Sequence, residues 1–137
     1  MLNPDFRDML SAFIDGEVEF LIIGAYALSA HGLPRATGDL DFWIHPTEDN
    51  AARVLTALVA FGAPIAEISA DDLLTPDRVL QIGVEPNRID ILTSIDGVEF
   101  PEAWSERMTA RIDDLDVPIL GLRHLIANKR ATGRPTA

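Results

Sequence analysis

Two aspartates separated by a single residue are the feature of this sequence best suited to chemistry. Asp39 and Asp41 flank Leu40 in residues 39–44, where polar and apolar side chains alternate as in a strand. That alternation places both carboxylates on one face. Mg²⁺ prefers hard oxygen ligands and is usually held by one or two carboxylates together with substrate phosphates. The pair therefore predicts a metal site, and a solvated strand face is the alternative interpretation of the same pattern.

A third acid, Asp90, lies between Ile89 and Ile91 in a run that is otherwise expected to be buried. Burial of a carboxylate costs free energy unless a partner offsets the loss of water. A neighbouring cation is one such partner, and a position at the edge of the sheet is another solution. Asp90 by itself does not distinguish between these two explanations.

A small-residue turn, Gly24-Ala25, follows the apolar run at residues 18–23, which predicts a buried strand. A short helix is expected next, over about residues 25–30. Residues with little or no side chain let backbone N–H groups approach an anion at a helix N-terminus. The turn is therefore a candidate phosphate site, although many strand-to-helix turns need glycine for steric reasons only.

The other elements are predicted from apolar periodicity and from capping residues. Helices are expected from Asn3-Pro4 to Gly16, from Thr47 to Gly62, around residues 71–74 and 100–107, and near residues 120–131. Extended segments are expected over residues 79–84 and 88–92, joined as a hairpin, and within residues 110–119. This order predicts an α+β fold, with residues 1–137 forming a single domain. The three histidines lack metal-ligand spacing, and Trp43, Phe100 and Trp104 are expected to serve packing.

The composition narrows the classes of partner and the location. The formal net charge of −11 disfavours a duplex DNA partner, because neutralisation of phosphates supplies most of that affinity. The chain has no cysteine, so a reducing cytoplasmic location is expected. We find no export signal and no apolar run of membrane-spanning length, so no membrane association is expected.

The order of these features resembles the signature of the nucleotidyltransferase superfamily. That signature is a hydrophobic residue, glycine, a small residue, a gap, Asp-x-Asp, and a third acid on a later strand. Here it reads Ile23-Gly24-Ala25, then Asp39-Leu40-Asp41, then Asp90. More narrowly, FLIIGAYALSAHGLPRATGDLDFWI and RIDILTSIDGVEF resemble a bacterial branch of small nucleotidyltransferases related to toxin–antitoxin and phage-resistance proteins. The similarity spans roughly residues 18–130.

The resemblance implies a nucleotidyltransferase-like mixed β-sheet flanked by helices. It also implies Mg²⁺-dependent (or Mn²⁺-dependent) transfer of a nucleoside monophosphate from a nucleoside triphosphate such as ATP to an acceptor hydroxyl, with release of pyrophosphate. The metal-binding and catalytic residues would be Asp39, Asp41 and Asp90, with Asp90 as a candidate general base. The nucleotide-binding residues would be Gly24, Ala25, Arg35, Thr37 and Lys129. A surface role for Arg35 and a helix-dipole role for Lys129 are the alternatives.

Two departures from the family pattern leave a second function open. Ala25 stands where relatives usually have glycine or serine, and the chain ends at Ala137, where relatives tend to continue into a further helix, so either the C-terminal helix is truncated or this member lacks that element. The acceptor of an active enzyme would be tRNA or another RNA, a partner protein or a small molecule. The alternative is a weakly active or inactive nucleotidyltransferase-fold antitoxin or binding module that acts through protein–protein contact.

Overall fold

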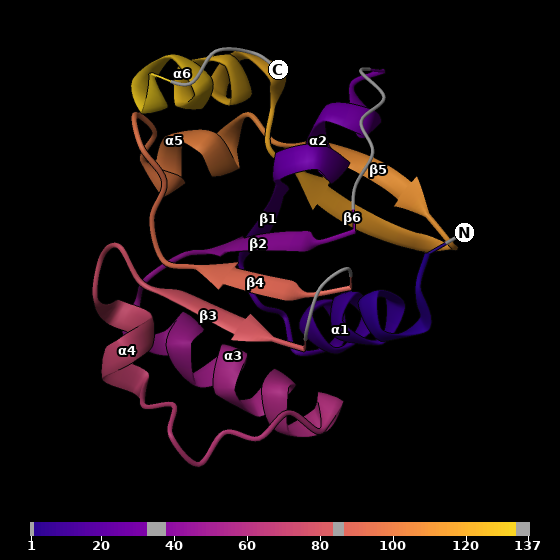
Figure 1. The fold of residues 1–137 in the computed structure, drawn as a ribbon, viewed down its shortest axis with the longest axis vertical. Coiled ribbons are helices and arrows are strands. Elements are labelled where there is room, and N and C mark those ends of the chain that lie inside the picture. Colours follow the sequence, from indigo (N-terminus) through magenta and orange to yellow (C-terminus); the bar gives the residue numbers. More distant parts are fainter. Residues whose placement is uncertain (1, 33–37, 84–86, 134–137) are drawn as a thin grey trace.

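A six-stranded mixed β-sheet with helices on both faces forms the framework of the protein (Figure 1). The structure is a computed structural model that describes residues 2–32, 38–83 and 87–133. The α+β class expected from the sequence is confirmed, and so is a mixed sheet flanked by helices.

The strands lie in the order β3-β4-β2-β1-β6-β5, and most neighbours are antiparallel. Their bounds are β1 Phe20–Ile23, β2 Leu40–Ile44, β3 Val79–Ile82, β4 Ile89–Leu92, β5 Met108–Ile112 and β6 Leu115–Ile119. The pairs β1 with β6 and β2 with β4 are parallel. The predicted hairpin of β3 and β4 is confirmed, and β5 and β6 form another in which the turn residues Asp113 and Asp114 both have positive φ.

The helices begin and end close to the predicted residues. Their bounds are α1 Pro4–Asp15, α2 Gly24–Ala30, α3 Glu48–Phe61, α4 Ala70–Leu74, α5 Phe100–Ser105 and α6 Leu122–Thr132. The Thr47 hydroxyl accepts a hydrogen bond from the backbone N–H of Asn50 and so caps α3. Gly62 ends the same helix in the left-handed region, at φ +94°.

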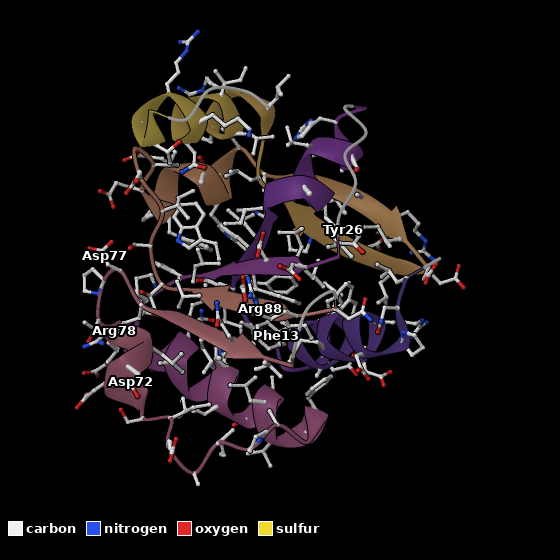
Figure 2. All side chains as sticks on the ribbon, viewed as in Figure 1. Phe13, Tyr26, Asp72, Asp77, Arg78 and Arg88 are labelled. Atoms are coloured by element: carbon white, nitrogen blue, oxygen red, sulfur yellow. The ribbon has the colours of Figure 1, made fainter. Side chains whose placement is uncertain are left out.

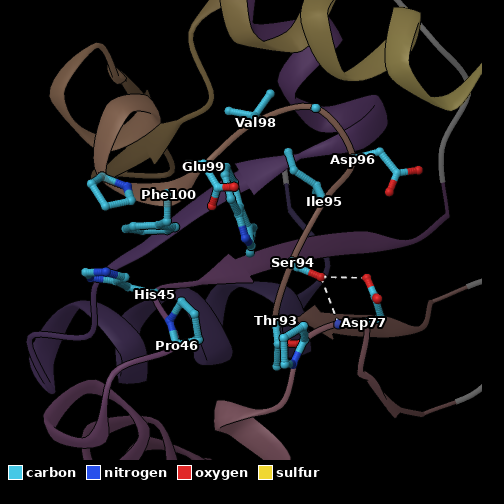
Figure 3. A pocket seen from close by; sticks show the side chains of 14 residues that line it. His45, Pro46, Asp77, Thr93, Ser94, Ile95, Asp96, Val98, Glu99 and Phe100 are labelled. Carbon is cyan, nitrogen blue, oxygen red and sulfur yellow. Dashed lines mark hydrogen bonds between the residues drawn. The ribbon is translucent and has the colours of Figure 1, made fainter.

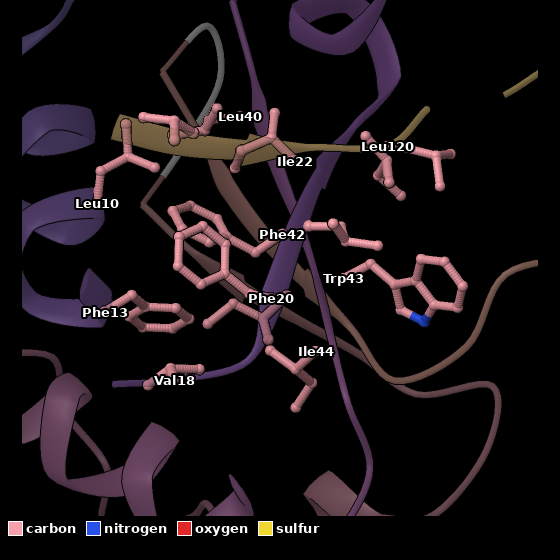
Figure 4. Packing of buried hydrophobic residues seen from close by; sticks show 14 of the residues in the cluster. Leu10, Phe13, Val18, Phe20, Ile22, Leu40, Phe42, Trp43, Ile44 and Leu120 are labelled. Carbon is pink, nitrogen blue, oxygen red and sulfur yellow. The ribbon is translucent and has the colours of Figure 1, made fainter. Parts of the chain in front are cut away.

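An aromatic core joins α1 to one face of the sheet. The rings of Phe13, Phe20 and Phe42 form a triangle with centroid distances of 4.8, 5.3 and 5.5 Å. Figure 4 shows these rings on one side of the sheet, with Trp43 pointing to the other. Full burial of one such ring stabilises the fold by roughly 1.5–3 kcal/mol. This face is therefore closed by packing, and α1 and α3 cover it (Figure 1).

The opposite face of the sheet carries Asp41, one of the acids singled out in the sequence. Strand alternation places Asp41 and Trp43 of β2 on this face, while Leu40 and Phe42 lie on the core face. Trp43 packs edge-to-face against Phe100 of α5 at a centroid distance of 5.0 Å. Helices α2, α5 and α6 lie on this side (Figure 1).

Two segments differ slightly from the expected bounds. The first strand begins at Phe20 rather than at residue 18, because Val18 and Glu19 lie before the pairing register with β2 begins. Asp39 precedes the first residue of β2 instead of belonging to it. None of the helices within the described residues has the length and apolar character needed to span a membrane.

Candidate active site

The parallel register of β2 and β4 brings the predicted acids together. Asp41 lies directly beside Asp90 of β4 on one side and beside Ile23 of β1 on the other. Residues opposite each other in neighbouring strands share a face, and so do residues two apart in one strand. Asp39, two residues before Asp41, is tied to the same group by its contacts with Arg88. The register therefore places Asp41 and Asp90 side by side and Arg88 links Asp39 to Asp90, while the catalytic and metal-binding roles of the three acids stay predictions.

Gly24 lies against this acidic group because β1 runs antiparallel to β2 and ends there. Its φ is +72°, in the left-handed region, and a Cβ at this position would lie 2.3 Å from Oδ2 of Asp41. Such a distance is far inside van der Waals contact, so a Cβ here would displace the Asp41 carboxylate, and the positive φ would strain any other residue. Helix α2 begins at this residue. Glycine is therefore favoured sterically, and the binding of phosphate at this turn stays a prediction.

Arg88 links two of the three aspartates. Its Nε donates to Oδ1 of Asp90 at 2.8 Å, and its Nη2 donates to Oδ2 of the same carboxylate at 3.2 Å. Nη2 also lies 3.3 Å from Oδ2 of Asp39. Asp90 is only 9% exposed, so this two-pronged contact offsets much of the cost of burying its charge. Figure 2 shows Arg88 beside β4, near the middle of the view.

The Asp41 carboxyl has a raised affinity for a proton. Burial raises the pKa of Asp41 from an ordinary value of 3.8 to about 6, and the neighbouring Asp90 adds to the rise through its charge and a side-chain hydrogen bond. The charge of Asp39 acts in the same direction, whereas the Arg88 guanidinium lowers the pKa. A carboxyl poised near neutral pH beside two others is the arrangement in which a cation or a proton relieves repulsion.

Asp39 and Asp90 both form ion pairs with Arg88 in this structure. Within the described ranges, no group of three or more His, Cys, Asp or Glu side chains has the spacing to hold a metal ion. The chemistry of the donors nevertheless suits Mg²⁺ or Mn²⁺, because all three are carboxylates and their mutual repulsion raises the pKa of Asp41. A metal would have to draw Asp39 and Asp90 away from the guanidinium.

The other residues predicted to bind the nucleotide do not form one group in the structure. Ala25 is the second residue of α2 and adjoins Gly24. Lys129 lies in the last turns of α6 and makes no ion pair with the three aspartates within the described part of the chain. Arg35 and Thr37 fall outside the described residues.

Sequence reasoning missed Arg88, although a signal for it was present. Arg88 lies two residues before Asp90, a spacing that places both side chains on one face of an extended chain. From the sequence, a nearby cation is one partner that could offset the burial of Asp90. In the structure that cation is Arg88, the residue directly before β4.

The comparisons with known proteins bear on the fold. No protein-family model matches the sequence, and no curated protein matches it significantly. Among solved structures, the chain is similar to the "putative nucleotidyltransferase" of Thermotoga maritima, with a TM-score of 0.70 and 13% sequence identity. The match covers 98% of this chain and 88% of that one. At this identity the likeness shows a shared fold over nearly the whole chain.

Proposed function

We propose that this protein is a nucleotidyltransferase that transfers a nucleoside monophosphate from a nucleoside triphosphate to an acceptor hydroxyl and releases pyrophosphate. The observation that carries the proposal is the pairing of Asp41 with Asp90 on one sheet face, with Asp39 linked to Asp90 through Arg88, beside a glycine bend where a Cβ would meet the Asp41 carboxylate. The shared fold with a protein named as a nucleotidyltransferase agrees with it.

The three aspartates would hold Mg²⁺ or Mn²⁺, which when bound would neutralise the triphosphate and favour ionisation of the acceptor hydroxyl. Asp41, with a pKa of about 6, can take up or release a proton near that pH. Both oxygens of Asp90 accept from Arg88, so its role as general base, expected from the family resemblance, requires release of that contact.

The nucleotide would bind beside the glycine bend. Gly24 and Ala25 begin α2 and offer backbone N–H groups at the end of the sheet where Asp41 lies. Arg35 and Thr37, in the loop that precedes the acids, and Lys129 of α6 remain proposed nucleotide contacts. A cation among them would balance the charge on the leaving pyrophosphate.

The test is transfer of label from α-³²P-labelled nucleoside triphosphates in the presence of Mg²⁺ or Mn²⁺ and a cell extract. The size of the labelled product distinguishes an RNA such as tRNA, a partner protein of the toxin–antitoxin kind, and a small molecule. We expect transfer by the wild type and none by Asp41→Asn. The matched control is Asp15→Asn, an exposed aspartate at the end of α1, which should retain full transfer.

A specific observation favours a second function, that of an antitoxin-like binding module. The Arg88 guanidinium already neutralises part of the acidic group from within the chain. In a protein that binds no metal, Arg88 would relieve the repulsion among the aspartates. The acidic surface of such a protein would attract a basic partner. This alternative predicts a stable complex that survives Asp39→Asn combined with Asp41→Asn. Loss of the complex in that double variant would contradict it.

A further inference from the structure

Arg88 and Gly24 lie on opposite flanks of the acidic group. In the sheet, β2 lies between β1 and β4. Gly24 directly follows β1, and Arg88 directly precedes β4. A nucleoside triphosphate bound beside Gly24 would therefore leave the β4 flank to the acceptor. This step rests on the proposed function, in which the nucleotide binds at the glycine bend.

The sheet face beyond Asp90 is accessible to an acceptor. Gln81 of the edge strand β3 pairs directly with Asp90, and Val79 pairs with Leu92, so all four share the face that carries Asp41. Gln81 is exposed, and Val79 is 53% exposed. The helices on this side of the sheet therefore leave the β3 part of the face uncovered, next to Asp90.

The backbone of Arg88 is fixed, but its side chain can change conformation. The Leu40 N–H donates to the Arg88 carbonyl at 3.0 Å, and the Arg88 N–H donates to Oδ1 of Asp39 at 3.3 Å. The Arg88 side chain is 24% exposed and has several rotatable bonds. The guanidinium can thus turn away from Asp90 while the pairing of β2 with β4 stays intact.

The Arg88 contacts use the carboxylate oxygens that a metal ion would need. The guanidinium is paired with both oxygens of Asp90 and one of Asp39, at 2.8, 3.2 and 3.3 Å. The same oxygens cannot fully serve two cations, and two neighbouring cations repel each other. With Mg²⁺ on the aspartates, the guanidinium would be left in a partly buried place without its anions, which is costly. Phosphate oxygens match the guanidinium fork and would replace them.

The neighbouring cavity is a poor place for a phosphate. It measures about 430 Å³ and lies beyond the carboxyl ends of β2 and β4, where the chain after β4 forms much of its wall (Figure 3). Among the described residues of this wall are three acids, Asp77, Asp96 and Glu99, and no Lys or Arg. A phosphate on the acceptor would be repelled there and attracted to Arg88 instead.

We propose that the acceptor carries a phosphate close to its reactive hydroxyl, and that Arg88, released from Asp39 and Asp90 when Mg²⁺ binds, holds this phosphate. The acceptor class is thus a phosphorylated sugar hydroxyl, either of a small sugar phosphate or at the 3′ end of an RNA. Arg88 is an acceptor-binding residue in this account. An acceptor hydroxyl without a phosphate would leave the guanidinium unpaired.

The experiment follows the Arg88 Nε–H resonance of the full chain by ¹H–¹⁵N NMR, and Arg88→Met identifies the resonance. Excess Mg²⁺ and then saturating inorganic tripolyphosphate are added first, so that the site beside Gly24 is filled. Ribose 5-phosphate is titrated next, with ribose as the uncharged probe of matched shape. We expect Mg²⁺ to shift the resonance. Ribose 5-phosphate should shift it further and should bind about tenfold or more tightly than ribose.

Two matched comparisons complete the design. Arg88→Met should weaken binding of ribose 5-phosphate by about tenfold or more, whereas Arg78→Met should not. Arg78 is an exposed arginine directly before β3, and strand alternation directs it to the opposite face of the sheet from Val79. A diadenosine ribonucleotide, titrated beside ribose 5-phosphate, identifies the source of the phosphate. Tighter binding of the dinucleotide supports an RNA end, and tighter binding of the sugar phosphate supports a small molecule.

Four results would overturn the proposal. The first is an Arg88 resonance that Mg²⁺ leaves unchanged. The second is a shift completed by tripolyphosphate alone, which would assign Arg88 to the nucleotide. The third is equal binding of ribose and ribose 5-phosphate by the wild type, a comparison that needs no variant. The fourth is an equal loss of binding in Arg88→Met and Arg78→Met. Label transfer by the wild type is compatible with all four, so failure of the proposed function is recognised separately by absence of that transfer.

Discussion

Replacement of Asp41 by asparagine should stabilise the protein at neutral and alkaline pH, although it removes a residue of the candidate active site. The pKa of Asp41 is about 6 in the folded protein, against an ordinary value of 3.8. Between these two values the folded state binds more protons than the unfolded state, so stability is fully present below pH 3.8 and falls as pH rises through 6. Asparagine carries no charge and avoids this loss.

The size of the effect follows from the two pKa values. Their difference corresponds to about 3 kcal/mol for a fully buried group. The Asp41 side chain is half-buried, so solvent screening reduces the expected gain to about 1–2 kcal/mol. For a domain of this size that gain raises Tm by roughly 3–8 °C.

The assay is urea unfolding of the wild type and Asp41→Asn at pH 8 and at pH 4, with Asp15→Asn as an exposed control. The variant should be more stable than the wild type at pH 8, and this advantage should disappear at pH 4, where the wild-type carboxyl is protonated in the folded state. The control should differ from the wild type by less than about 0.5 kcal/mol at both pH values. An Asp41→Asn variant that is less stable than the wild type at pH 8, or whose advantage is the same at both pH values, would refute the reasoning.

Three further predictions concern the acidic group and the sheet that carries it. Gly24→Ala should lower the free energy of unfolding by about 2–4 kcal/mol, because its Cβ would lie 2.3 Å from Asp41 and its φ is +72°; unchanged urea unfolding would place Asp41 elsewhere. Arg88→Met should cost about 2 kcal/mol near pH 7 by leaving Asp90 without its cation, and Mg²⁺ should raise the Tm of this variant more than that of the wild type; an equal response to Mg²⁺ would separate the acids from metal binding. Asn50→Ala should cost about 2–4 kcal/mol, because the 1% exposed Asn50 side chain makes three hydrogen bonds to backbone groups at the ends of β1 and β2; a loss below about 0.5 kcal/mol in thermal unfolding would show that these bonds contribute little.

Interactions between residues close in sequence were enough to predict most of the helices and strands. The Thr47 cap and the Gly62 terminus bracket α3 almost to the residue, because capping depends on neighbours within one turn. Alternation likewise placed Asp41 on the face opposite Leu40 and Phe42, whereas Asp39 lies before the first residue of β2.

What could not be predicted depends on contacts distant in sequence. The proximity of Asp41 and Asp90 results from the parallel register of β2 and β4, and many residues separate the two strands. The ion pairs of Arg88 depend on that register too, so the sequence raised the question of a cation without identifying it. Trp43 was correctly expected to serve packing, but its unpartnered N–H was not foreseen, because the chain after β4 that encloses it has no periodic pattern.

Mg²⁺-dependent transfer of label from a nucleoside triphosphate, compared between the wild type and Asp41→Asn, tests the central proposal most directly. The urea experiment shows independently whether the variant is folded, so a loss of transfer can be assigned to chemistry. The proposal predicts label transfer with pyrophosphate release by the wild type and none by the variant. Absence of transfer by the wild type with every triphosphate and both metal ions, or equal transfer by the two proteins, would contradict it.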